Sequence, residues 1–375
     1  MSCTQPSKTK VSIPVPPANP APTILVGSQD NIGTRLFISD NPETVDSNTT
    51  TFTNGYATMW SDTTTGKATV RYRMFIWHLN KTGAPFKFGI TVGNAGSSTY
   101  SIHNVRSAIS NEANFGEIGK CAAAALVGET MDSISPTDAT VAPGDLSVVK
   151  EWTVPNNTLI GGVIEFSISN QAAGAPMTYR VRSVIASNPS SNLRLNQNPV
   201  VNYFVGTGGS THPRGSWDFA DISSSATYTA ATSGAGWKHY KMSAGFTSYD
   251  NIMTSENSYK IAGAPASQGP ASSNKGHYGV KYNLKVSLTN TTGSTKTVKI
   301  YMAAGGTHPY TGAVLWSGEG ATYKVPALAA GTGANQDAVE IASVSIANNQ
   351  TINRVITVSN AGGAATPSLI AFRTM

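Results

Sequence analysis

One stretch of sequence occurs twice in this chain of 375 residues, at a constant spacing of 210 positions and without a gap. The paired positions in residues 66–96 and 276–306 are Gly66 with Gly276, Val70 with Val280, Tyr72 with Tyr282, Asn80 with Asn290, Thr82 with Thr292, Gly83 with Gly293, and Ile90 with Ile300. A second pair of similar segments begins at Pro155 and at Ala347. A solenoid needs a shorter period and more copies. The chain must therefore contain two copies of one domain.

The repeated unit is typical of a β-hairpin. The runs VRYRMFIWHLN and VKYNLKVSLTN alternate as half-buried strands do. NKTG and NTTG supply the Asn and Gly that a tight reversal needs. Only 12% of the residues are charged, and a surface rich in Ser, Thr and Gly suits short strands and turns. We predict an all-β fold of two tandem homologous antiparallel β-sandwiches, with jelly-roll or immunoglobulin-like topology. The one helical candidate is the Ala-rich stretch around Cys121.

The repeat also sets the expected domain boundaries. We predict the first sandwich over residues 25–190 and the second over 198–375, joined by the polar segment SNPSSNLRLNQNP. Residues 1–24 contain six prolines, at 6, 14, 16, 17, 20 and 22. Such a segment favours extended conformations, so we predict a disordered Pro-rich arm or tether.

The two cysteines, Cys3 and Cys121, lie in such different settings that we predict no disulfide between them. Cys3 precedes a polar, Pro-rich segment, as the lipidated cysteine does in mature bacterial lipoproteins. The arm is thus either a lipoprotein tether lipidated at Cys3 or an ordinary disordered arm. The N-terminus lacks the apolar core of a signal peptide, and no apolar run is long enough for a transmembrane helix. We expect an extracellular or cell-envelope location, with membrane attachment only through a lipid anchor.

Several short motifs carry a resemblance to a family. RLFISDNPE and the following SDTTTGKATVRYRMFIWHLNKTGAPFKFGITVGN resemble a poorly characterised class of bacterial surface proteins with duplicated β-sandwich domains. The matching positions are Ser39, Asp40, Pro42, Glu43, His78, Asn80 and Asn94. THPRGSWDFAD and GHYGVKYNLKVSL are similar to the partner domain of such proteins. The resemblance covers about a third of the chain, implies a secreted or envelope location and assigns no chemistry.

Two of the six histidines share a Gly-Gly-(Ser)-Thr-His-Pro setting, at His212 and His308. Pairing across the second hairpin brings His277 to the same end as His308. Three histidines with an open position suit zinc or copper, so His212, His277 and His308 are a candidate metal site. The sequence Thr-His-Pro also favours a turn. The alternative is therefore that these histidines lie in structural turns and bind no metal.

Loop-borne aromatic residues of the second domain are candidates for stacking on sugar rings. They are Trp217, Trp237, Tyr240, Tyr310 and Trp316. Tryptophan and tyrosine also pack in cores, and that alternative stays open.

Other functional classes lack support in the sequence. The net charge of +6 is scattered rather than clustered, which argues against nucleic-acid binding. Asp40 and Glu43 are close in sequence, but no Asp-rich calcium loop is present. We find no nucleophile elbow, zinc-protease motif, phosphate loop or dinucleotide motif. An enzyme is therefore the less favoured class, and no cofactor is predicted beyond a possible zinc or copper.

The leading hypothesis is a non-enzymatic surface protein that binds a cell-envelope polysaccharide or another protein. The first alternative is a structural coat or lattice subunit, such as a virion double jelly roll, a surface layer or a filament, whose arm reaches a neighbour in self-assembly. The second is a metal-binding enzyme or sensor that uses the histidines of the second domain.

Overall fold

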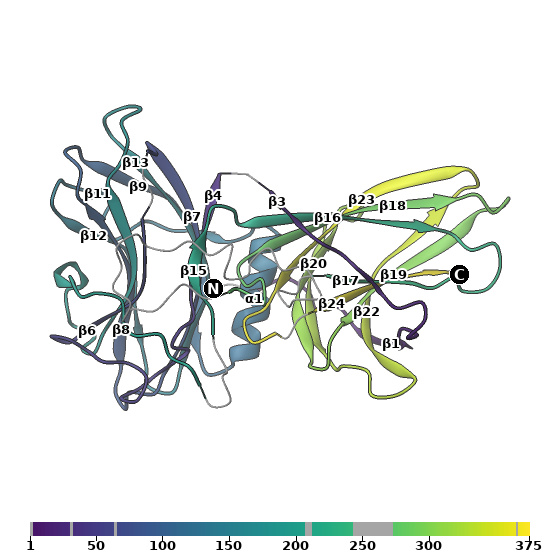
Figure 1. Ribbon diagram of the computed structural model, residues 1–375, viewed down its shortest axis with the longest axis horizontal. Coiled ribbons are helices and arrows are strands. Elements are labelled where there is room, and N and C mark those ends of the chain that lie inside the picture. The colour runs from purple at the N-terminus through teal and green to yellow at the C-terminus, as the bar shows by residue number, and fades with distance from the viewer. Residues whose placement is uncertain (1–2, 31–32, 64–65, 207–211, 243–272, 365–366) are drawn as a thin grey trace.

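The two copies of the repeat form two β-sandwiches, and the helix α1 (Phe115–Val127) lies between them (Figure 1). This computed structural model describes the whole chain except residues 1–2, 31–32, 64–65, 207–211, 243–272 and 365–366. The prediction of tandem β-sandwiches is confirmed. The Ala-rich helix around Cys121 is confirmed as α1.

The first sandwich has one large and one small sheet. The large sheet has the order β10–β9–β13–β7–β4–β15, with β5 beside β7 and β11 beside β9. These strands are β10 (Asp132–Ser133), β9 (Tyr100–Glu112), β13 (Leu159–Asn170), β7 (Thr69–Asn80), β4 (Thr34–Ser39), β15 (Arg214–Trp217), β5 (Thr44–Val45) and β11 (Thr140–Val141). The small sheet consists of β12 (Leu146–Val154), β8 (Phe86–Asn94), β14 (Tyr179–Ala186) and β6 (Tyr56–Asp62), in that order.

The second sandwich repeats this arrangement. One sheet consists of β21 (Thr322–Leu328), β20 (Tyr310–Trp316), β23 (Gln350–Asn360), β18 (Lys281–Asn290), β16 (Asp221–Thr229) and β3 (Ser28–Asp30). The other consists of β1 (Lys10–Pro14), β22 (Asn335–Ile346), β19 (Lys296–Ala304), β24 (Ser368–Thr374), β17 (Lys238–Met242) and β2 (Thr23–Ile24). In both sandwiches the first long strand runs parallel to the third, β4 to β7 and β16 to β18. The intervening strand lies in the facing sheet, so the chain returns in the same direction.

The hairpin turns of the two copies agree in their hydrogen bonds. The Asn80 side-chain amide donates to the carbonyls of Ala84 and Val154, each at 2.9 Å. The Asn290 amide donates to the carbonyls of Ser294 and Ile346, at 2.8 and 2.7 Å. In each copy the side-chain oxygen also accepts from the backbone N–H two residues later. These buried amides fix the turn, and this explains why they recur in the sequence.

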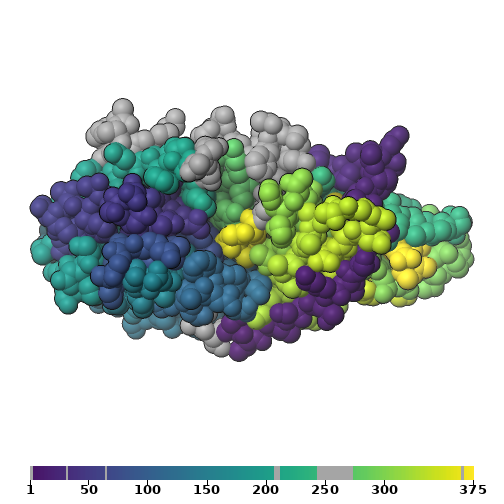
Figure 2. Space-filling model, turned by 90° about the horizontal axis from the view of Figure 1, so that it is seen from below, coloured from purple at the N-terminus to yellow at the C-terminus, as the bar shows by residue number. Residues whose placement is uncertain are grey.

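The prediction that residues 1–24 are disordered is wrong for the described part of that segment. Residues 6–8 bond to Lys324 on β21, and β1 pairs with β22. Strands β2 and β3 then pair with β17 and β16. The segment thus runs along the outer strands of both sheets of the second sandwich (Figures 1 and 2). Unpaired edges of a sheet are prone to association with other chains. A Pro-rich segment can pair with such an edge, because an outermost strand donates backbone hydrogen bonds on one side only and therefore tolerates residues that lack an N–H.

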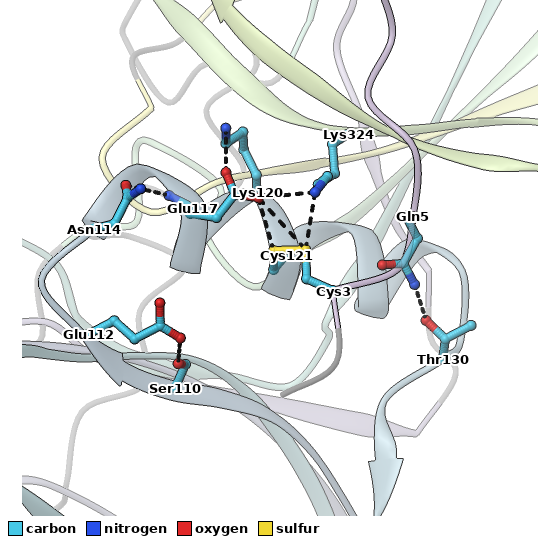
Figure 3. The surroundings of a disulfide bond; sticks show 10 residues. All are labelled: Cys3, Gln5, Ser110, Glu112, Asn114, Glu117, Lys120, Cys121, Thr130 and Lys324. Atoms are coloured by element: carbon cyan, nitrogen blue, oxygen red, sulfur yellow. Dashed lines mark hydrogen bonds and ion pairs between the residues drawn. A yellow bond between two sulfur atoms is a disulfide. The ribbon is translucent and has the colours of Figure 1, made fainter.

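The N-terminal segment is also tied covalently to α1. Cys3 and Cys121 form a disulfide with 5.3 Å between their Cα atoms (Figure 3). The expectation that the two cysteines do not pair is therefore wrong, because the arm folds back to the helix instead of leaving the molecule. Lys324 donates to Glu117 beside this bond, at 3.0 Å. A sulfur in a disulfide cannot also carry a thioether-linked lipid, so Cys3 is not available for lipidation in this structure.

The predicted domain boundaries also differ from the observed sheets. Strand β3 completes a sheet of the second sandwich, whereas β15 completes a sheet of the first. The two sandwiches therefore exchange short edge strands across the boundary. Residues 187–199, the segment predicted to be a linker, pack on the first sandwich, where Leu193 is buried against Val148 and Val184.

Candidate functional site

A cleft of about 370 Å³ opens on the first sandwich, between residues 48–57 and 198–204. Its aromatic lining residues are Tyr56, Tyr203 and Phe204. Its polar lining residues are Asn48, Thr49, Thr51, Thr53, Asn198 and Asn202, and the described lining contains no charged residue. The Phe204 side chain is 38% exposed. The cleft thus combines ring surfaces with neutral hydrogen-bonding groups.

Hydrogen bonds hold both walls of the cleft in place. The Asn41 side-chain amide donates to the carbonyl of Phe204 at 2.8 Å, and its oxygen accepts from the Phe204 N–H at 2.9 Å. The Asn198 amide joins the walls by donating to the carbonyls of Thr53 and Tyr56. Because these amides are committed to the backbone, they position the lining without contacting a ligand.

A buried arginine, Arg214, bonds to the backbone of the 198–204 wall. The Arg214 guanidinium donates to the Val201 carbonyl at 2.9 Å. It also lies over the rings of Trp60 and Tyr203, at 5.5 and 5.1 Å from the ring centroids. Guanidinium stacking of this kind limits the rotamers of the tyrosine, so Tyr203 is held in one orientation at the cleft.

A charged cluster lies beside this wall, where the chain enters β15. His212 Nε2 lies 2.8 Å from Glu43 Oε2, and His212 Nδ1 lies 3.4 Å from Asp40 Oδ2. Hydrogen bonds to both carboxylates raise the pKa of His212 to about 10. Burial raises the pKa of Asp40 to about 7, against the opposing effect of His212. The imidazole is therefore protonated at neutral pH and bridges Asp40 and Glu43.

Three residues of the family resemblance, Ser39, Pro42 and His78, form a hydrogen-bonded network next to this cluster. His78 Nδ1 donates to the Pro42 carbonyl at 2.8 Å, and His78 Nε2 lies 2.8 Å from Ser39 Oγ. Burial lowers the pKa of His78 to about 4, so the ring is neutral. Ser39 and His78 are both fully buried. This pair therefore holds the 39–43 loop and offers no surface to a substrate.

The three histidines predicted to bind zinc or copper are found in three different settings. His212 pairs with Asp40 and Glu43, His277 is buried with its ring stacked on Tyr282, and His308 is exposed. Within the described residues, Asp40, Glu43 and His212 offer potential ligand atoms within 4.8 Å of one another, whereas the three histidines do not form such a group. A metal ion at His212 would have to compete with the ring proton. Zinc or copper binding stays a prediction, restricted to this cluster.

Four of the five aromatic residues predicted to contact a ligand are core residues. Trp217, Tyr240, Tyr310 and Trp316 are buried, so they have no ring face free for a sugar, and the alternative of core packing holds for them. Trp237 is only partly buried, and its ring stacks on His239 at 5.6 Å. Tyr56, Tyr203 and Phe204, the aromatic residues that line the cleft, were not predicted from the sequence. The run VVNYFVG after an Asn-Pro turn was a signal, because apolar residues are unusual in a connecting segment.

Comparisons with known proteins give no family. No family model matches the chain, and no curated protein matches it. Among solved structures, the CUB1-EGF-CUB2 domain of human MASP-1/3 is 8% identical, covers 86% of this chain and 99% of that chain, and has a TM-score of 0.16. The N-terminal CBM22-1-CBM22-2 tandem domain of Paenibacillus barcinonensis Xyn10C is 9% identical, covers 95% of this chain and 91% of that chain, and has a TM-score of 0.17. Scores this low carry no argument about function.

Two further observations bear on location. Within the described residues, no helix has the length and hydrophobicity to cross a bilayer. The Cys3–Cys121 disulfide is of the kind that persists in oxidising compartments.

Proposed function

We propose that this protein is a non-enzymatic extracellular binding protein that binds a polysaccharide in the cleft between residues 48–57 and 198–204. The observation that carries the proposal is the lining of this cleft, where Tyr56, Tyr203 and Phe204 stand among neutral amide and hydroxyl side chains. Binding sites of this kind combine apolar walls with a few oriented polar groups. A sugar offers the matching chemistry, because its ring faces are apolar and its hydroxyls donate and accept.

The surroundings of the cleft also favour binding over catalysis. The carboxylates of Asp40 and Glu43, beside the 198–204 wall, are engaged by His212. The carboxylate of Asp46 accepts hydrogen bonds from the backbone N–H groups of Asn48 and Thr49. Hydrolysis of a glycoside needs two carboxyl groups facing each other across the substrate, and the described lining has none. An extracellular location is supported by the disulfide.

A matched pair of variants tests the cleft. Phe204→Ala removes an exposed ring from the wall, and Phe115→Ala removes a ring of similar exposure, 37%, from the start of α1. We expect Phe204→Ala to weaken binding to a neutral polysaccharide about tenfold or more, and Phe115→Ala to leave it unchanged. Affinity electrophoresis against a panel of neutral plant and bacterial polysaccharides, followed by calorimetry on the best ligand, measures both. Equal losses in the two variants, or no binding to any member of the panel, contradict the proposal.

The coat or lattice alternative was motivated by an arm that reaches a neighbouring subunit. In this structure the described part of the arm pairs with the second sandwich of its own chain. Light scattering on the full chain tests the alternative directly, since a lattice subunit gives large particles and a binding protein stays monodisperse.

A further inference from the structure

A second pocket, of about 380 Å³, lies on the outer face of the sheet β12–β8–β14–β6. Two arginines of β14, Arg180 and Arg182, line it together with Gln197. Gln197 directly precedes residues 198–204 of the polysaccharide cleft, so the two pockets adjoin consecutive parts of one segment. The pocket shares no lining residue with that cleft.

Arg182 differs from the other buried arginines because it has neither a counter-charge nor a side-chain hydrogen bond among the described residues. Its exposed fraction is only 6%. The buried Arg35 bonds to Asp62, and the buried Arg73 bonds to Glu165 and Asp221. Within the described part of the chain, Arg182 has neither an ion pair nor a hydrogen bond. Burying a charge without a partner costs free energy. An anion that enters the pocket from solution would lower this cost.

Burial and the neighbouring charge of Arg180 lower the pKa of Arg182 to about 10. The guanidinium still carries its charge at neutral pH. Two arginines facing one pocket repel each other, and an anion between them relieves both this repulsion and the unpaired burial.

The strands on both sides of Arg182 place neutral hydroxyl residues opposite it. Arg182 lies opposite Thr91 on β8 and opposite Ser61 on β6. The hydroxyl oxygens of Thr91 and Ser61 are buried and have no hydrogen-bond partner within the described residues. Neither residue lines the pocket, so these hydroxyls do not contact a bound anion. The strand neighbours of Arg182 are neutral and do not compensate its charge.

The duplication shows that the fold itself does not require these arginines. Strand β24 pairs with β19 in the register in which β14 pairs with β8, so Leu369 and Ala371 take the places of Arg180 and Arg182. Both are buried in an apolar cluster that includes Ile13 of the N-terminal segment. The second sandwich thus closes this face with apolar side chains, whereas the first keeps it charged and open.

We propose that the pocket binds an oxyanion group, a sulfate, phosphate or carboxylate, with Arg182 as the main ligand and Arg180 as the second. Asp145 is the acidic residue in the described lining; it is exposed and forms no ion pair with either arginine. It weakens anion binding by repulsion, so its removal is expected to strengthen it. This site does not depend on the polysaccharide cleft.

The test uses the full-length, disulfide-bonded protein with sodium sulfate, sodium phosphate and sodium glucuronate as probes, against sodium chloride at equal ionic strength. At least one oxyanion is expected to raise the Tm and to give a calorimetric isotherm. Arg182→Gln is expected to abolish the Tm increase and to weaken binding at least about tenfold, while Arg182→Lys keeps part of it. Asp145→Asn is expected to tighten binding about two- to fivefold.

Two controls separate a binding role from a structural one. Arg354→Gln, an equal loss of charge on the second sandwich, is expected to leave the oxyanion effect intact. In chloride alone Arg182→Gln is expected to raise the Tm, because it removes an uncompensated buried charge. A lowered Tm in chloride with an unchanged oxyanion response overturns the proposal, as does the absence of any oxyanion effect on the unsubstituted protein.

A final comparison distinguishes a free anion from an anionic group on a polymer. If dextran sulfate competes with sulfate, uncharged dextran does not, and Arg182→Gln removes the competition, the site is assigned to an anionic group on a polymer. Competition by free sulfate alone assigns it to a small anion. Because these probes act at Arg182 and the neutral polysaccharides act at Phe204, failure at one site is distinguishable from failure at the other.

Discussion

The two sandwiches have the same hairpin, down to the hydrogen bonds of Asn80 and Asn290, but they are covered differently. The small sheet of the first is covered in part by residues 188–200, where Leu193 enters a buried apolar cluster. An added Cβ at Gly89 would lie 2.3 Å from the Leu193 side chain, so this glycine makes room for the cover. The corresponding sheet of the second is covered by the N-terminal segment through Ile13.

This difference separates fold from function within one molecule. The core strands were duplicated, and their order is the same in both copies. The coverings were not duplicated, and both pockets proposed here lie against the covering of the first sandwich. The residues proposed to bind come from these coverings and from strand positions that differ between the copies, such as Arg180 and Arg182, where the second sandwich has Leu369 and Ala371.

Deletion of residues 1–24 should give the largest effect, because it exposes the edges and the apolar face of the second sandwich only. The loss includes a disulfide, worth about 2–5 kcal/mol, and the burial of Ile13, worth about 1.5–3 kcal/mol. We expect the Tm to fall by about 10–20 °C, measured by calorimetry. Cys3→Ser with Cys121→Ser removes the disulfide alone and should give a smaller decrease. A deletion that leaves the Tm within about 2 °C contradicts the structural role of the arm.

Arg73→Met should give the second-largest loss of stability, because it leaves the buried Asp221 carboxylate without its ion-pair partner. Arg73 is fully buried and joins β7 of the first sandwich to Asp221 of the second. Breaking a buried ion pair costs about 3–5 kcal/mol. The matched position in the second sandwich is Asn283, which bonds to Thr357 and is only partly buried. Asn283→Ala should cost about 1 kcal/mol, and urea unfolding measures both. Equal costs at the two positions would show that the ion pair has no special role.

The local features of the fold could be predicted from the sequence, because they depend on neighbours along the chain. These local features are the alternating strands, the NKTG and NTTG turns and the Ala-rich helix. The arm was misjudged because its proline content is typical of a tether, whereas its partners on β22 lie more than 300 residues away. The disulfide joins residues 118 positions apart, beyond any local pattern.

The candidate sites were less predictable for the same reason. The cleft is built from two segments separated by about 140 positions, held together by Asn198. His212 was predicted to lie beside His277 and His308, whereas its partner in the structure is Asp40, which is 172 positions away in the sequence. Arg182 belongs to no sequence motif, and its significance lies in the ion pair that it does not form, which only the structure shows.

Asn80→Ala and Asn290→Ala compare the two copies where they are most alike. Each substitution leaves buried backbone carbonyls without a donor, at a cost of about 1–3 kcal/mol. Because the contacts match, the two costs should agree within about 1 kcal/mol in urea unfolding. Asn202→Ala, in the exposed cleft wall, serves as the control and should cost less than about 0.5 kcal/mol. A large difference between the two turns would show that one copy no longer depends on its asparagine.

The smallest expected effect concerns the pH dependence of the His212 bridge, for which the second sandwich has no equivalent within the described residues. The pKa of His212 is raised from 6.5 to about 10 in the folded protein, so its stabilisation is complete below pH 6.5 and is lost as the pH rises toward 10. Its side chain is 42% exposed, and solvent screening limits the effect to about 1–3 °C in Tm. Tm measured from pH 6 to 10 should fall more steeply for the unsubstituted protein than for His212→Gln. His308→Gln, at an exposed loop position, should follow the unsubstituted curve. If His212→Gln follows it too, the imidazole does not bridge Asp40 and Glu43 in solution, and the wall of the cleft is held by Asn41, Asn198 and Arg214 without it.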